Sequence, residues 1–190
     1  SLLETGDYSF ICFGGAIKHE DYSPQKTDKY GEDLVVYPVD GYGTQDSVRS
    51  IIRTERPDML WFMTDPRFFP WLWEIEDEIR ANIPMVYYHV WDNFPAPEFN
   101  GKWYRSTDEI VAISKVTYGC VKEVVPEASL NYIPHAVPTQ FFHPATSNDE
   151  KNKAATLRNN IINTSTEFNN PKKKIFFWNS RNARRKLGGT

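Results

Sequence analysis

The chain has 190 residues, of which 40% are hydrophobic and 15% aromatic, and its formal net charge at pH 7 is -3. This length is enough to bury one sizeable core. Without a basic excess there is no general attraction for nucleic acid, so we expect no nucleic-acid partner. No apolar run approaches the roughly 20 residues that a membrane-spanning helix needs.

The cysteine content indicates the cellular environment. The two cysteines, Cys12 and Cys120, lie far apart in apolar segments and show neither CxxC nor metal-site spacing. Such residues are typical of buried free thiols in a reducing compartment. We therefore predict a cytoplasmic protein with no metal site.

Apolar runs alternate with helical patterns along most of the chain. Thr44 and Ser114 are predicted helix caps, and an amphipathic helix between them carries apolar residues at helical spacing, from Phe68 to Ile79. Residues 16–32 have no clear period, so a loop and a short helix both remain open. The predicted strands are 8–13, 34–39, 59–63, 83–90, 109–113, 130–133 and 175–178. This strand–helix–strand order predicts an α/β fold with a Rossmann-like, doubly wound and mostly parallel sheet.

The composition changes after Pro144, which suggests a domain boundary. Residues 146–170 are polar and carry at most one helix, at about 148–162, and a new apolar strand follows three lysines. We therefore predict an N-terminal domain over residues 1–145, a linker with a surface helix over 146–171, and the start of a second domain over 172–190.

The stretch 83–97 carries the strongest functional signal. An apolar run is followed abruptly by His89, Asp92 and Asn93, and then by two prolines that cannot continue a central strand. Ligands of open α/β sheets bind beyond the carboxyl ends of the strands. Alternatively, the stretch is a strand followed by a turn, with His89 hydrogen-bonded in the packing.

A second polar pair follows the preceding strand, where Thr64 and Asp65 come after residues 59–63. If the two strands are neighbours, both loops open on one edge and share a crevice. A histidine there could act as a base or hydrogen-bond a sugar hydroxyl. No nucleophile elbow, P-loop or zinc spacing is present, and Gly14-Gly15 is a weak phosphate-loop signal.

A basic run lies near the end of the sequence, directly after the predicted strand 175–178. Arg181, Arg184, Arg185 and Lys186 could neutralise a diphosphate, with arginine giving bidentate contacts and lysine a point charge. The alternative is a solvated basic tail.

Taken together, these motifs resemble the N-terminal half of a GT-B glycosyltransferase of the family 4 type (glycosyl transferases group 1). The similar segments are RPDML at 56–60, PMVYYHVWD at 84–92, DEIVAIS at 108–114, YIPHAVPTQFFHP at 132–144 and FWNSRNARRK at 177–186. The chain departs from the family where His135-Ala136 replaces Asn-Gly and Ser180 replaces a glycine. The family's first strand and most of its donor domain are not matched, so we expect an incomplete donor site and an inactive fragment.

The resemblance implies transfer of a sugar, with retention of configuration, from a nucleotide diphosphate sugar to a hydroxyl of a carbohydrate or lipid-linked acceptor. It implies no cofactor and no metal, and it leaves peripheral membrane association open. His89 and Asp92 would be catalytic, and Thr64, Asp65 and Asn93 would bind the acceptor. The donor diphosphate would be bound by Arg181, Arg185 and Lys186. The alternative hypothesis is a non-catalytic module that binds a nucleotide or a protein.

Overall fold

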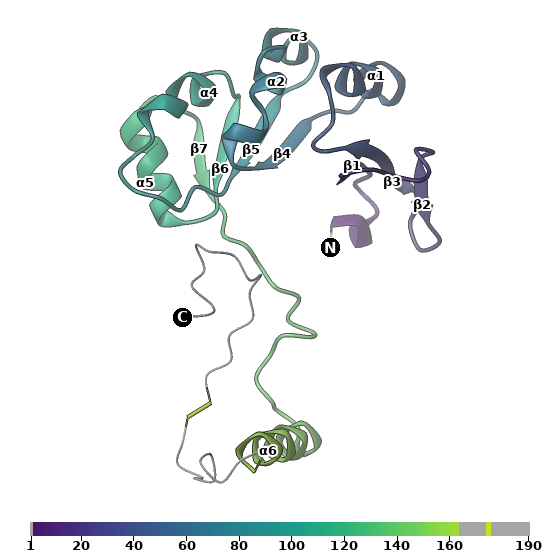
Figure 1. Cartoon of the computed structure of the whole chain (residues 1–190), viewed down its shortest axis with the longest axis vertical. Helices are drawn as coiled ribbons and strands as arrows, with labels where there is room; N and C mark the ends of the chain where they lie inside the picture. The colour runs from purple at the N-terminus through teal and green to yellow at the C-terminus, as the bar shows by residue number, and fades with distance from the viewer. Residues whose placement is uncertain (1, 164–173, 176–190) are drawn as a thin grey trace. The chain divides into compact units, whose positions relative to one another are not determined.

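The computed structural model describes residues 2–163 and 174–175. The chain divides into two compact units, Ser1–Ala136 and Val137–Thr190. The first unit ends within the predicted N-terminal domain and holds both sheets of the described residues (Figure 1).

The smaller sheet of the first unit follows a short 3-10 helix, η1 (Leu2–Thr5). It contains β1 (Phe10–Ala16), β2 (Gln25–Thr27) and β3 (Gly31–Asp40) in the order β1-β3-β2. β1 pairs with β3 in parallel and β2 pairs with β3 in antiparallel. β2 lies in the stretch predicted as a loop or short helix. Its three exposed polar residues carry no strand pattern, so the sequence could not indicate it.

The larger sheet has four parallel strands in the order β4-β5-β6-β7. Their bounds are β4 (Leu60–Thr64), β5 (Met85–His89), β6 (Glu109–Ala112) and β7 (Leu130–Tyr132). The structure thus confirms a mixed α/β fold with a parallel sheet flanked by helices. It differs from a single continuous sheet, because β1 and β4 belong to separate sheets within the described residues.

The helices of the first unit confirm two predicted caps and correct one predicted helix. Thr44 caps α1 (Gln45–Glu55) and Ser114 caps α5 (Lys115–Val124), each by accepting a backbone N–H from three residues ahead. The single helix predicted around residues 68–79 is wrong. It consists of η2 (Pro66–Phe68), α2 (Pro70–Trp73) and α3 (Glu76–Arg80). Proline has no N–H for a helical bond, and Ile75 has non-helical dihedrals between α2 and α3.

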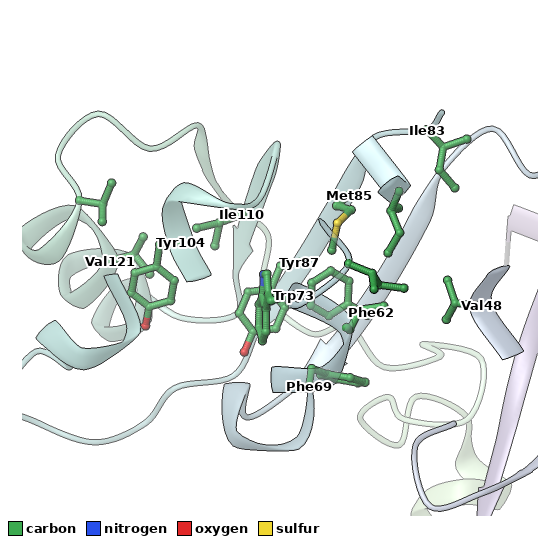
Figure 2. Packing of buried hydrophobic residues seen from close by; sticks show 14 residues of the cluster. Val48, Phe62, Phe69, Trp73, Ile83, Met85, Tyr87, Tyr104, Ile110 and Val121 are labelled. Atoms are coloured by element: carbon green, nitrogen blue, oxygen red, sulfur yellow. The ribbon is translucent and has the colours of Figure 1, made fainter. Parts of the chain in front are cut away.

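Aromatic rings fill the core between the parallel sheet and its helices. The rings of Phe62 and Tyr87 stack with centroids 4.9 Å apart, and Trp73 meets both edge-on (Figure 2). Such pairs contribute about 0.5–1.5 kcal/mol beyond the burial of their area. Phe69 and Trp73, from the segment predicted as an amphipathic helix, both belong to this core. This packing fixes β4 and β5 side by side.

Two short elements connect β5 to β6, namely η3 (Glu98–Asn100) and α4 (Gly101–Arg105). In the second unit, α6 (Asn148–Ile162) confirms the helix predicted there. It begins with a capping box in which Ser147 and Glu150 each accept the other's backbone N–H. The Glu150 carboxylate also accepts the backbone N–H of Thr146. Together these hydrogen bonds lower the pKa of Glu150 to about 2.

Two further predictions concern the strand at residues 175–178 and membrane-spanning helices. Of the predicted strand 175–178, only Ile175 is described, and it lies in neither a helix nor a strand. Within the described parts of the chain, no helix is both long and apolar enough to cross a bilayer.

Candidate functional site

The parallel register brings three strand ends to one edge of the larger sheet. Thr64 at the end of β4 is the register partner of His89 at the end of β5, and His89 is the partner of Ala112 in β6. β4 and β5 are therefore neighbours, which is the condition for one site shared by the loops that follow them. The loops that carry Asp65 and Asp92 leave the sheet at this carboxyl edge, where α/β folds bind ligands.

Thr64 has a strained backbone at this edge. Its φ is 128°, a conformation that a β-branched residue rarely adopts. Its carbonyl oxygen accepts a hydrogen bond from the buried Tyr87 hydroxyl. Strain of this kind persists where the surroundings hold it, and it often occurs at functional sites.

The Asp65 carboxylate takes part in a local turn next to the strained residue. It accepts the backbone N–H of Arg67 at 3.1 Å and lies 3.4 Å from that guanidinium. Its side chain is 28% exposed. One carboxylate oxygen thus caps η2, while part of the carboxylate still faces solvent.

His89 lies beneath the edge and is fully buried. Its Nε2 is 2.7 Å from the hydroxyl of Tyr104, which also accepts a hydrogen bond from the Asn100 amide at 3.2 Å. The Asn100 amide donates to the tyrosine oxygen, and the direction of the second bond depends on which ring nitrogen of His89 carries the proton, Nε2 or Nδ1. That Nδ1 and the Asn100 oxygen have no hydrogen-bond partner among the described residues.

Burial also determines the charge of His89. It lowers the pKa of the imidazole to about 3, because the charged form would be desolvated. The ring is therefore neutral near pH 7 and has no exposed surface for a ligand. This is the packed histidine that the sequence left as the alternative, and a catalytic role for His89 stays a prediction.

Asp92 and Asn93 have the opposite environment, because both residues are exposed. The backbone on either side of Asp92 is tied down. The Trp91 carbonyl accepts the Thr117 hydroxyl at 2.6 Å, and the Asn93 carbonyl accepts the Trp91 indole N–H at 2.7 Å. The Cys120 thiol also lies 3.8 Å from the Asn93 carbonyl. A fixed loop thus presents an exposed carboxylate.

Comparison of the chain with protein-family models, curated proteins and solved structures finds no match. The resemblance to GT-B glycosyltransferases therefore depends on the motifs quoted above.

Three supporting residues were not predicted to belong to the site. The hydrogen bond from Thr117 to the Trp91 carbonyl joins residues 26 positions apart, so no local pattern indicates it. Asn100 and Tyr104 lie in short elements with no periodic pattern. The predicted diphosphate-binding residues Arg181, Arg185 and Lys186 lie outside the described residues. Among those that are described, no cluster of three or more His, Cys, Asp or Glu side chains could hold a metal ion.

Proposed function

We propose that this chain forms the acceptor-binding side of a nucleotide-sugar-dependent glycosyltransferase with a Rossmann-like domain of the GT-B type. The observation that carries this proposal is the register of Thr64, His89 and Ala112. It places the polar loops after β4 and β5 at one carboxyl edge, and the loop after β5 contains Asp92, the last residue of the similar segment 84–92.

In this proposal the exposed Asp92 carboxylate accepts hydrogen bonds from hydroxyls of the acceptor or of the transferred sugar. Thr64, Asp65 and Asn93 surround the same edge and add further polar contacts. His89 acts from below, because its hydrogen bond to Tyr104 holds the end of β5 in place. The sequence led us to expect direct contact between His89 and the substrate, whereas we now propose that His89 acts indirectly.

Sugar transfer breaks the bond between the anomeric carbon and the diphosphate, so negative charge builds on the leaving group. Arg181, Arg185 and Lys186 are the proposed groups that stabilise this charge. Arginine offers paired donors to phosphate oxygens and lysine a mobile point charge. Stabilisation of charge that develops in the transition state raises the rate of the chemical step.

The test is the release of nucleoside diphosphate from a panel of UDP- and GDP-sugars with simple methyl glycosides as acceptors, using the full-length gene product. We expect turnover in the unmodified protein and at least a hundredfold loss in Lys186→Ala, about the effect of removing one group that stabilises a developing charge. The matched control is Lys151→Ala, an exposed lysine on α6. Equal turnover in the two variants would contradict the assignment of the diphosphate site.

A non-catalytic binding module remains the second candidate because of one surface. On the face of β4 opposite Phe62, Trp61 is 51% exposed and its ring lies 5.7 Å from that of Tyr88, which in turn stacks on His135 at 5.2 Å. Met63, two residues further along β4 on the same face, is 43% exposed, and adjoining exposed apolar side chains are typical of interaction sites. Binding of a nucleotide or protein that depends on Trp61, without release of nucleoside diphosphate from any donor, would favour the module.

A further inference from the structure

The loop formed by residues 91–100, here named the aromatic loop, is anchored on α5. The buried Thr117 hydroxyl donates to the Trp91 carbonyl at 2.6 Å, so its oxygen is left to accept the Ser114 hydroxyl at 2.9 Å. Ser114 in turn accepts the Thr117 backbone N–H at 3.0 Å. This closed set of bonds fixes where the loop begins.

The same loop exposes two large apolar rings. Phe94 is 71% exposed and Phe99 is 68% exposed, although both belong to a loop whose backbone is held in place. Phe99 is braced by Trp91, with ring centroids 5.9 Å apart and planes at 70°. A ring that is held in position but open to solvent loses little freedom when a ligand packs on it.

Acidic groups accompany these rings. Asp92 and Glu98 are exposed, and the aromatic loop contains no lysine, arginine or histidine. A surface with this charge is repelled by anionic lipid headgroups and offers nothing to a phosphate. It suits an uncharged ligand that can donate hydrogen bonds.

We propose that the aromatic loop binds a neutral sugar ring and that the acceptor of the proposed transferase is therefore a neutral glycan. The face of an aromatic ring is electronegative and attracts the C–H bonds on the face of a pyranose. The Asp92 carboxylate accepts hydroxyl protons, and the Asn93 amide can both donate and accept. This inference rests on the proposed function for the role of the ligand, but the binding itself does not require catalysis.

The direct experiment is saturation-transfer NMR on the full chain with methyl glucoside, methyl mannoside and methyl galactoside as probes. We expect transfer to the ring C–H protons of at least one glycoside. The double variant Phe94→Ala/Phe99→Ala should bind that glycoside about tenfold more weakly, because it removes both rings on which the sugar packs. The matched control is Phe141→Ala, a phenylalanine that is 73% exposed and lies outside the loop.

A second pair of variants tests whether Thr117 anchors the aromatic loop on α5. Thr117→Val removes the bond to the Trp91 carbonyl and should weaken binding of the glycoside, while Thr117→Ser keeps the hydroxyl and should restore it. Folding of each variant is checked by circular dichroism and by hydrogen exchange of the core strands. Equal affinities of the valine and serine variants would overturn the role of Thr117.

Two results would overturn the sugar assignment itself. One is the absence of saturation transfer to all three glycosides. The other is binding to phosphatidylglycerol vesicles that is lost in the Phe94→Ala/Phe99→Ala variant, which would make the loop a lipid contact. Glycoside binding without nucleoside diphosphate release would leave the inference standing and reject the transferase. Release that is unchanged in the double variant would reject the inference and leave the transferase.

Discussion

Tyr104 connects the two buried polar groups beneath the carboxyl edge. Its hydroxyl accepts from Asn100 and is hydrogen-bonded to Nε2 of His89, so removal of either contact leaves a polar atom unpaired in the core. An unpaired buried group costs about 1–3 kcal/mol. At the scale of single residues, the exposed edge thus depends on a buried network.

The first residue-scale prediction concerns pH. The pKa of His89 is lowered from 6.5 to about 3 in the folded chain, so the fold favours the neutral ring. This contribution to stability is fully present above about pH 6.5 and is lost as the pH falls toward 3. Between pH 7 and pH 4.5 the loss should be about 3 kcal/mol. Urea unfolding at the two pH values measures it.

The control for this prediction is His89→Gln, which keeps a hydrogen-bonding side chain but does not titrate. Between pH 7 and pH 4.5, the free energy of unfolding of this variant should fall by about 3 kcal/mol less than that of the unmodified protein. The same pH dependence in both proteins would show that the imidazole is accessible and titrates normally.

The sequence could narrow the role of His89 to two alternatives but could not choose between them. The choice depends on Tyr104, which lies 15 residues further on and contacts the imidazole only because η3 and α4 turn back toward β5. No periodic pattern marks those short elements. The exposure of Asp92, in contrast, follows directly from a polar residue in a proline-rich loop.

At the scale of elements, α5 links the sheet to the aromatic loop. Ser114 caps the helix and also completes the bonds of Thr117. Ser114→Ala should therefore cost more than a cap alone, about 1.5–2 kcal/mol in urea unfolding.

Thr44→Ala is the matched comparison, because Thr44 caps α1 in the same way and its two hydrogen bonds with Ser47 are exposed. That variant should cost about 1 kcal/mol. A smaller loss for Ser114→Ala than for Thr44→Ala would contradict the coupling of the cap to the loop.

At the scale of elements, the features that could be predicted are those that a local sequence pattern marks. Both caps and α6 were predicted, because a capping residue before an amphipathic or polar helical run is a local pattern. The break between α2 and α3 was missed. The apolar residues keep their helical spacing across Ile75, and only its dihedrals show the interruption. β2 has no apolar residue and depends on its pairing with β3.

At the scale of the whole molecule, residues 133–149 are exposed without interruption, and the boundary between the two units falls among them at Ala136. Exposed irregular backbone is where proteases cut first. We predict that brief chymotrypsin treatment cleaves at Phe141 or Phe142 and leaves the preceding unit intact, as measured by mass spectrometry. Earlier cleavage within β4 or β5 would contradict the assignment of the first unit as a compact body.

The parallel sheet could be predicted from the alternation of strands and helices. The sequence left open whether β4 and β5 are neighbours, and their pairing is what brings Thr64, His89 and Asp92 to one edge. The separation between β1 and β4 could not be predicted. Both strands are apolar runs that a continuous sheet would also require, and their failure to pair is a long-range property.

The most direct test of the central claim is the effect of Asp92→Asn on transfer by the full-length protein. The amide keeps the size of the side chain and removes the charge at the carboxyl edge. The matched control is Asp58→Asn, an exposed aspartate shortly before β4 at the opposite end of the strand. We predict at least a hundredfold fall in acceptor-dependent release of nucleoside diphosphate for Asp92→Asn and no change for Asp58→Asn. Equal rates in the two variants would contradict the assignment of this edge as the site of transfer.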